Sequence, residues 1–224
     1  MKFENIKAVI FDLDGTLADT IPGIRNAVNR VRAEYGLAPI SSEETQKGLN
    51  HGIANLMDVT VATELGDRSP EMLGRLTTQY VEELELTFND EVEPYPGMPD
   101  AVAELRRRGY RVAVLSNKPD RFVKPQINTL YGEGTIRVRR GVVDVNIRKP
   151  DPALTHEMLD ELGEGILPSE CVMVGDSDVD IHTARNAGMK ALSVSWGYRD
   201  REFLLSCEPD AIVDSAEELL SLFE

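Results

Sequence analysis

The chain has 224 residues, of which 42% are hydrophobic, 28% charged and 6% aromatic, a composition typical of globular proteins and unlike that of disordered or fibrous ones. The 24 basic and 39 acidic residues leave a net charge of −15, which argues against binding to nucleic acid or to an acidic membrane surface. No apolar run reaches the roughly 18–20 residues that a membrane-spanning helix needs. The length suits one domain with a large insertion.

The N-terminal stretch and the cysteines predict a cytoplasmic protein. The N-terminal stretch mixes acidic and basic residues and leads directly into a short apolar run, which predicts a first strand and not a signal peptide. Cys171 and Cys207 are too few for a disulfide framework, and Cys171 opens an apolar run, so we expect it to be buried as a free thiol. A reducing compartment is the expected location.

Short apolar runs alternate with helical patterns along most of the chain. The runs are continuous, as in strands that are covered on both faces of a parallel sheet, and they span residues 8–11, 112–115, 171–174, 191–194 and 211–213. Helices are predicted at 99–108, 152–162, 178–186 and 216–223, where capping residues or glycines mark the boundaries. This alternation predicts the α/β class, with a doubly wound, Rossmann-like parallel sheet.

The region from residue 19 to residue 91 has helical periodicity and no convincing strand. Two predicted helices each have one apolar face, formed by Ile24, Val28, Val31 and Tyr35 in the first and by Leu73, Leu76, Tyr80 and Leu84 in the second. A proline- and glycine-rich cluster at 94–97 marks the return to the sheet. We therefore predict a helical domain, 19–91, inserted into an α/β domain of residues 1–18 and 92–224.

Acidic residues follow two of the predicted strands. Asp12 and Asp14 follow the run 8–11, while Asp176 and Asp180 follow the run 171–174. The carboxyl ends of parallel strands meet at the sheet edge where ligands bind. Residues two apart on an extended chain project to the same side, and residues four apart lie one helical turn apart, so the four carboxylates can converge. Because crowded carboxylates repel one another, this pattern predicts a bound Mg²⁺.

Groups suited to an oxyanion accompany these carboxylates. Ser116 follows the run 112–115, Lys149 precedes a predicted helix, and the backbone N–H groups of Gly15 and Asn117 can contact an oxyanion. Phosphoryl transfer depends mainly on positioning and charge stabilisation, which this set can provide. One of Asp12 and Asp14 can attack phosphorus while the other serves as acid and then as base.

Four segments resemble the motifs of the haloacid-dehalogenase-like superfamily of aspartate-nucleophile hydrolases, and they occur in the same order. The segments are Asp12-Leu13-Asp14-Gly15-Thr16-Leu17, Ser116-Asn117-Lys118-Pro119, Lys149-Pro150-Asp151-Pro152 and Gly175-Asp176-Ser177 to Asp180. Within the superfamily, the chain is most similar to phosphoglycolate phosphatases that carry a helical cap. Further support comes from Tyr95-Pro96-Gly97, residues 184–189 and Trp196-Gly197-Tyr198. The resemblance covers nearly the whole chain.

The resemblance implies a role for each matching residue of the first motif. Asp12 would be the nucleophile that forms an aspartyl-phosphate. Asp14 would protonate the leaving oxygen and then activate water, and its main-chain carbonyl would bind Mg²⁺. Gly15 and Thr16 would belong to the phosphate-binding turn.

The other motifs complete the implied site. Ser116 and Lys149 would hold the transferring phosphoryl group, with Asn117 beside them. Asp176 would join Asp12 as a carboxylate ligand of Mg²⁺, and Asp180 would support the metal or its waters. The family sheet order 5-4-1-2-3 is expected, with the cap closing over the site.

Substrate choice is assigned to the cap segment Lys47-Gly48-Leu49-Asn50-His51-Gly52. Lys47, Asn50 or His51 could contact a carboxylate or hydroxyl of the substrate, and an ordinary interhelical turn is the alternative. Phosphoglycolate phosphatases tend to have Gly-Asn-Gly in place of Asn50-His51-Gly52, so the substrate stays open. No role is assigned to Arg25, and Trp196 and Tyr198 are interpreted as packing residues.

The expected activity is Mg²⁺-dependent hydrolysis of a small phosphorylated metabolite, with 2-phosphoglycolate as the first substrate to test. A sugar-phosphate mutase, a pyrophosphatase and a nucleotidase remain alternatives that share the machinery. Dehalogenation is disfavoured, because Asp14 supplies an acid and base that dehalogenases do not place there. A non-catalytic phospho-acceptor module belongs to a different class, and it has no place for the insertion at 19–91. A monomer and a homodimer are both compatible with the sequence.

Overall fold

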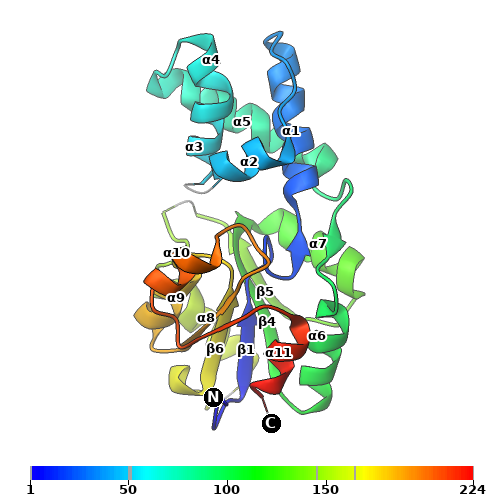
Figure 1. The fold of residues 1–224 in the computed structure, drawn as a ribbon, viewed down its shortest axis with the longest axis vertical. Coiled ribbons are helices and arrows are strands. Elements are labelled where there is room, and N and C mark those ends of the chain that lie inside the picture. Colours follow the sequence, from blue (N-terminus) through cyan, green and yellow to red (C-terminus); the bar gives the residue numbers. More distant parts are fainter. Residues whose placement is uncertain (1, 50–51, 145, 164, 224) are drawn as a thin grey trace. The chain divides into compact units, whose positions relative to one another are not determined.

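The computed structural model describes residues 2–49, 52–144, 146–163 and 165–223. The chain forms two compact units (Figure 1). The α/β unit comprises Met1–Asp19 and Pro94–Glu224, and the helical unit comprises Thr20–Glu93. Two short strands, β2 (Ala18–Asp19) and β3 (Glu93–Pro94), pair where the chain passes between the units.

The described part of the α/β unit contains a six-stranded parallel sheet with the order β5-β4-β1-β6-β7-β8. Central β1 (Ala8–Phe11) pairs with β4 (Arg111–Pro119) on one side and with β6 (Cys171–Gly175) on the other. Strand β5 (Val138–Val142) flanks β4, while β7 (Lys190–Val194) and β8 (Ala211–Val213) continue beyond β6. Without β8, this order is the predicted 5-4-1-2-3 arrangement read from the other edge, so the predicted fold class is confirmed.

The sheet differs from the sequence-based expectation at β4 and β5. The predicted run 112–115 extends through Ser116 to Pro119, and the register shifts between Leu115 and Pro119. Strand β5 carries Arg139-Arg140 at half-buried positions, so it has no continuous apolar run to reveal it. Sequence patterns therefore find the strands that are covered on both faces and miss the polar edge strand.

Helices cover the sheet of the α/β unit. They are α6 (Met98–Arg107), α7 (Asp120–Tyr131), α8 (Pro152–Leu162), the 3₁₀ turn η2 (Pro168–Glu170), α9 (Asp178–Ala187), α10 (Arg201–Ser206) and α11 (Ala216–Ser221). Helix α8 has the predicted bounds, and the carboxylate of Asp151 accepts a hydrogen bond from the backbone N–H of Ala153 at 2.8 Å. This N-cap satisfies an amide that the helix itself cannot pair.

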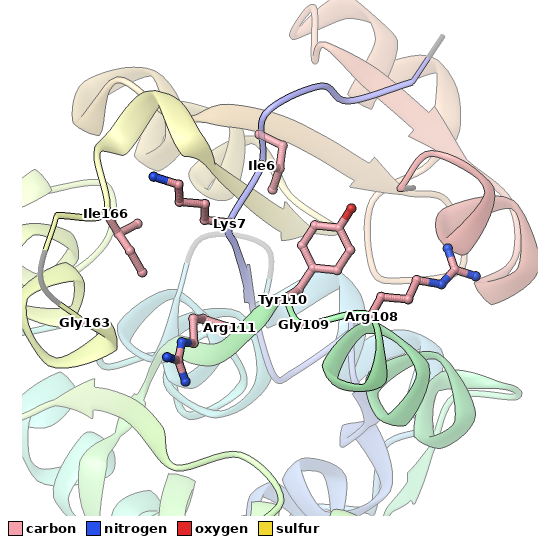
Figure 2. Close-up of a pocket in the computed structure, with 8 residues that line it drawn as sticks. All are labelled: Ile6, Lys7, Arg108, Gly109, Tyr110, Arg111, Gly163 and Ile166. Atoms are coloured by element: carbon pink, nitrogen blue, oxygen red, sulfur yellow. The ribbon is translucent and has the colours of Figure 1, made fainter.

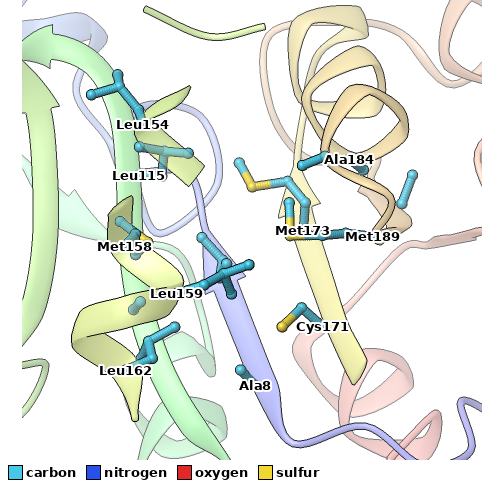
Figure 3. Packing of buried hydrophobic residues seen from close by; sticks show 14 of the residues in the cluster. Ala8, Leu115, Leu154, Met158, Leu159, Leu162, Cys171, Met173, Ala184 and Met189 are labelled. Atoms are coloured by element: carbon cyan, nitrogen blue, oxygen red, sulfur yellow. The ribbon is translucent and has the colours of Figure 1, made fainter. Parts of the chain in front are cut away.

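One face of the sheet packs on a cluster that includes residues of α8, α9 and α10 (Figure 3). Ala8 and Ile10 of β1 belong to this cluster, whereas Val9 and Phe11 project to the opposite face, because successive strand residues alternate. All four side chains are fully buried, which explains why the sequence of β1 is continuously apolar. Cys171 lies in the cluster and forms no disulfide, as predicted.

The helical unit contains two long helices and several short ones. Its elements are α1 (Ile21–Glu34), α2 (Ser42–Leu49), α3 (Ile53–Met57), the π-helix η1 (Asp58–Ala62), α4 (Thr63–Leu65) and α5 (Pro70–Thr87). Helices α1 and α5 pack together, and their predicted apolar positions are buried at Ile24, Val28, Val31, Leu76, Tyr80 and Leu84. The predicted candidates Asn50 and His51 lie outside the described residues.

Arg32 is the buried charged side chain of the helical unit, among its described residues. Its Nε donates to the backbone oxygen of Ala38 at 2.6 Å, and its guanidinium also donates to the backbone oxygen of Thr60 in η1. The same guanidinium pairs with Glu64 at 2.8 Å. Arg32 therefore pairs the carbonyl group of buried Thr60 and the carbonyl group of Ala38 in the segment that follows α1.

A hollow of about 450 Å³ lies where β1 and β4 begin, at the sheet edge opposite to the carboxyl ends of the strands. Figure 2 shows that its basic side chains, Lys7, Arg108 and Arg111, point in different directions. Lys7 pairs with Glu170, and Arg108 pairs with Glu104. The basic groups therefore do not converge on one ligand position. Across the described ranges, no helix combines the length and the apolar character needed to cross a bilayer.

Candidate active site

The first motif leaves β1 in a tight turn at the carboxyl edge of the sheet. The backbone N–H of Asp12 donates to the oxygen of Val174 at 2.8 Å, which ties the turn to β6. Asp12 Oδ1 accepts the N–H of Leu13 at 2.7 Å. Gly15 has a φ of +81°, and a Cβ there would lie 2.3 Å from Asp176 Oδ2. Glycine is required both for this backbone conformation and for the close approach of the carboxylate.

Asp176 follows β6 and is held from two sides. Its Oδ1 accepts the hydroxyl of Thr16 at 3.0 Å, and its Oδ2 accepts the backbone N–H of Tyr198 at 2.8 Å. Each carboxylate oxygen has two lone pairs, so one donor on each leaves acceptor capacity for a cation. Thr16 and Tyr198 therefore fix the orientation of Asp176 without saturating it.

Asp180 lies on the first turn of α9, as the four-residue spacing predicts. Ser177 is the N-cap of this helix, and Asp180 Oδ2 accepts the backbone N–H of Ser177 at 3.1 Å and its hydroxyl at 2.6 Å. The other oxygen of Asp180 accepts Lys149 Nζ at 2.6 Å. Asp180 thus anchors both the helix start and the lysine of the third motif.

Asp12, Asp176 and Asp180 form one cluster, with a ligand oxygen of each within 4.8 Å of the others. Lys149 Nζ lies 2.9 Å from Asp12 Oδ2 and 2.6 Å from Asp180 Oδ1. When all three carboxylates are ionised, they and the one ammonium carry a net charge of −2 in this buried cluster. Oxygen ligands and an excess of two negative charges fit a divalent metal ion such as Mg²⁺.

Burial dominates the electrostatics of the cluster. It raises the pKa of Asp12 well above its ordinary value, with further increases from Asp180, Asp176 and Asp14 and an opposing effect from Lys149. The pKa of Asp176 rises to about 7, mainly through burial and then through Asp180, while the Tyr198 N–H and the Thr16 hydroxyl oppose the rise. Burial would lower the pKa of Lys149, but Asp12 and Asp180 raise it above its ordinary value. A cation would stabilise the ionised carboxylates, so the metal-binding interpretation also agrees with these shifts.

The second motif lies near the carboxyl end of β4. We call its first three residues the Ser116–Lys118 segment. Ser116 is buried, and its Oγ accepts the backbone N–H of Lys118 at 3.2 Å. The amide of Asn117 accepts the Lys149 N–H at 2.9 Å and donates to the Lys149 backbone oxygen at 3.1 Å. Lys118 Nζ pairs with Asp14 Oδ1 at 2.8 Å. Each residue of the segment therefore makes a different contact within the site.

The structure thus brings together the predicted site residues of the α/β unit. It also shows that the Gly197–Tyr198 segment contacts the site, which the sequence analysis did not predict. Gly197 would place a Cβ 2.2 Å from the Asp176 Cβ, and the next residue, Tyr198, donates its backbone N–H to Asp176. Trp196 Nε1 donates to the backbone oxygen of Thr16 at 3.1 Å. The interpretation of Trp196 and Tyr198 as packing residues is therefore incomplete. The Trp196-Gly197-Tyr198 triplet was the available signal.

Lys47 and Arg25, the two residues of the helical unit considered above that the structure describes, contact side chains of the same unit. Lys47 is exposed and pairs with Glu43 at 2.7 Å. Arg25 contacts Ser42 at 3.3 Å and Glu91 at 3.1 Å. These contacts assign neither residue to a substrate.

The fold and the buried aspartate cluster define an α/β enzyme with an acidic, cation-compatible site at the carboxyl edge of its sheet. A family model described as haloacid dehalogenase-like hydrolase matches residues 9–194. The chain therefore belongs to the haloacid dehalogenase-like hydrolases, which confirms the resemblance stated from the motifs.

Relatives of similar length support this membership. A phosphoglycolate phosphatase of Chromobacterium violaceum is 33% identical, with 100% of this chain and 99% of the relative covered. Another, from Yersinia pestis, is 32% identical over 98% of this chain and 94% of the relative. These relatives are phosphoric monoester hydrolases.

Solved structures show the same fold. A protein of Lactobacillus delbrueckii subsp. bulgaricus has a TM-score of 0.86 at 29% identity, with 99% of both chains covered. A haloacid dehalogenase-like family hydrolase of Streptococcus pneumoniae has a TM-score of 0.84 at 21% identity, covering 98% of this chain and 99% of that one.

Proposed function

We propose that this protein is a Mg²⁺-dependent phosphatase that hydrolyses small phosphate monoesters through an aspartyl-phosphate, with 2-phosphoglycolate as the leading substrate. The observation that carries the proposal is the buried cluster of Asp12, Asp176 and Asp180, with ligand oxygens within 4.8 Å of one another and Lys149 contacting two of the three. Membership of a hydrolase family supports the reaction class.

In the first step, a carboxylate oxygen of Asp12 attacks phosphorus and the ester bond breaks. Asp14 donates its proton to the departing ester oxygen, which leaves as an alcohol. In the second step, Asp14 takes a proton from a water molecule, whose oxygen attacks the same phosphorus and releases inorganic phosphate. The Asp12 carboxylate is thereby restored, and Asp14 is again protonated for the next cycle.

Ser116 and Lys149 are assigned to the oxygens of the transferring phosphoryl group. Lys149 supplies a compact positive charge, and the reciprocal contacts between Asn117 and the Lys149 backbone, at 2.9 and 3.1 Å, fix where that charge sits. Asp12 and Asp176 would hold Mg²⁺ with the Asp14 carbonyl, and Asp180 would support it. When bound, Mg²⁺ supplies charge neutralisation that lets an anionic phosphoryl group approach the acidic cluster.

The choice of 2-phosphoglycolate rests on the relatives of similar length, such as those of C. violaceum and Y. pestis, which are named phosphoglycolate phosphatases. Identity of about one third supports the chemistry more strongly than the substrate, because a change of one pocket contact can change specificity. We propose that the helical unit contributes to substrate choice, with a cytoplasmic location for the enzyme.

The test is release of inorganic phosphate from a panel of 2-phosphoglycolate, a hexose phosphate, a nucleoside monophosphate and pyrophosphate, with Mg²⁺ and after chelation. We expect multiple turnovers with Mg²⁺, the highest kcat/KM for 2-phosphoglycolate, and loss of at least about 99% of the activity after chelation. Faster hydrolysis of pyrophosphate or of the nucleotide would replace the proposed substrate. No multiple turnover on any compound would contradict the enzymatic proposal and favour a phospho-acceptor module.

A further inference from the structure

Lys118 is a buried cation of the site to which the proposed reaction gives no role. Its side chain is 4% exposed, and its Nζ lies 2.8 Å from Asp14 Oδ1, whose side chain is 19% exposed. The two residues are 104 positions apart in the sequence and reach each other from β4 and from the turn after β1. Contact with Asp14 links Lys118 to the residue assigned to proton transfer.

A structural purpose alone accounts poorly for this lysine. Removing an ammonium group from water is costly, and well-packed apolar residues often stabilise a protein as much as a buried ion pair does. The neighbouring Leu115 and Val114 of β4 are fully buried and apolar, so the strand accommodates such residues. A lysine at the end of β4 is therefore better explained by what it contacts.

Hydrogen bonds hold the backbone from which the Lys118 side chain reaches Asp14. The N–H of Lys118 donates to Ser116 Oγ at 3.2 Å, and the intervening Asn117 is held by Lys149 in both directions. The Ser116–Lys118 segment is thus anchored at each residue. A cation on an anchored strand can hold a carboxylate in one rotamer more effectively than a cation on a mobile loop can.

We propose that Lys118 is a positioning residue that holds Asp14 for both of its proton transfers. The ion pair fixes Oδ1, and Oδ2 carries the proton that passes to the leaving ester oxygen and is later recovered from water. This inference rests on the proposed function, because it gives Lys118 a role only if Asp14 acts as acid and base.

The leaving group of the substrate provides the first readout. The alcohol released from an alkyl phosphate must be protonated as it leaves, whereas 4-nitrophenolate leaves without a proton. In Lys118→Met, we expect kcat on 2-phosphoglycolate or ethyl phosphate to fall about 100-fold. With 4-nitrophenyl phosphate, the variant should release one equivalent of nitrophenolate per enzyme in a rapid burst, followed by slow turnover, because only the second step still needs Asp14.

Two further comparisons separate positioning from a merely structural effect. Lys118→Arg should recover much of the alkyl phosphatase activity, because it restores a cation that can hold Asp14. In an Asp14→Asn background, adding Lys118→Met should change kcat less than twofold, since the lysine acts through the missing carboxylate. Lys118→Gln serves the same comparisons if the methionine variant does not fold, and circular dichroism checks the fold of every variant.

The matched control is Lys190→Met, which removes an exposed lysine of the same unit that pairs with Asp210 at 3.2 Å. It should keep wild-type kinetics with the alkyl phosphates and with 4-nitrophenyl phosphate. Absence of the nitrophenolate burst in Lys118→Met, with formation of the aspartyl-phosphate slowed as much for the aryl ester as for the alkyl esters, would overturn the positioning role. Additive losses with Asp14→Asn would overturn it as well. A higher KM confined to 2-phosphoglycolate, with ethyl phosphate unaffected, would overturn it too and make Lys118 a contact of the substrate carboxylate.

Failure of this inference is distinguishable from failure of the proposed function. If the wild-type enzyme forms no aspartyl-phosphate, Asp12→Asn will keep turning over and Lys118→Met will show no burst. If the covalent route is correct and the positioning role is wrong, Asp12→Asn will be inactive, and Lys118→Met will release nitrophenolate with no burst that exceeds the one of the wild-type enzyme.

Discussion

The carboxyl edge of the sheet and the interior of the helical unit both contain buried charged side chains, but among the described residues only those in the helical unit are fully paired within the protein. At the sheet edge, Asp12, Asp176 and Asp180 lie together with an excess of negative charge, and burial raises the pKa of Asp12 and Asp176. In the helical unit, buried Arg32 is surrounded by acceptors that it satisfies. The first arrangement is suited to receiving a ligand, and the second is complete by itself.

The sharpest way to break this comparison is Asp12→Asn. Under the covalent mechanism, turnover should fall by at least about 10³-fold, because the amide is a poor nucleophile. The free energy of unfolding should stay equal or rise, since a neutral group replaces a carboxylate that burial disfavours. Phosphate release and urea denaturation measure the two effects.

Asp160→Asn is the control for this variant, because it makes the same chemical change at an exposed position of α8. It should alter neither activity nor stability. Near-normal turnover in Asp12→Asn would show that the covalent mechanism is wrong, and a large loss of stability would show that the acidic cluster holds the fold together.

Arg32→Met should have the opposite profile. It leaves the buried backbone oxygen of Thr60 without this donor and also removes the hydrogen bond to Ala38, so we expect a loss of about 2–3 kcal/mol in the free energy of unfolding. In hydrogen exchange, amides of the helical unit should exchange faster while those of the central strands keep their protection.

Arg30→Met is the matched control on the same helix, since Arg30 is half exposed and pairs with Glu83. Its effect should stay below about 1 kcal/mol. If the two arginine variants were equally stable, the buried guanidinium would have no special structural role.

The smallest expected effect concerns Glu104, whose ion pairs lie at the surface of the α/β unit. It tests whether a surface ion pair contributes little to stability even in the unit that carries the acidic cluster. Arg107 and Arg108 lower the pKa of Glu104 to about 2 from its usual value near 4.5. The stabilisation from ionised Glu104 is therefore present above pH 4.5 and is lost as the pH falls toward 2. Glu104→Gln should show a slightly lower denaturation midpoint than wild type at pH 7, with a difference that shrinks at pH 3. A constant difference across this range would mean that the ion pair is not its cause.

The sequence allowed the sheet and the acidic site to be predicted, because both depend on local patterns. Continuous apolar runs marked β1 and β6, and the spacing of Asp176 and Asp180 matched the first turn of α9. Strand β5 was missed because its half-buried arginines lack that pattern. The pairing of Lys118 with Asp14 and the contact of Tyr198 with Asp176 depend on residues brought together by the sheet, and local patterns carry no record of such contacts.

Three glycines, Gly15, Gly175 and Gly197, enclose the acidic cluster so closely that a Cβ on any of them would lie within 2.3 Å of an atom of Asp176 or Asp180. Main chain from three separate strand ends thus forms the walls around these carboxylates, and like charges cannot relax by swinging apart. The site therefore tolerates little drift during evolution: a single added methyl group in any wall forces either the backbone or a carboxylate to move. Laboratory redesign of this enzyme should accordingly leave these walls untouched and vary residues farther from the aspartates.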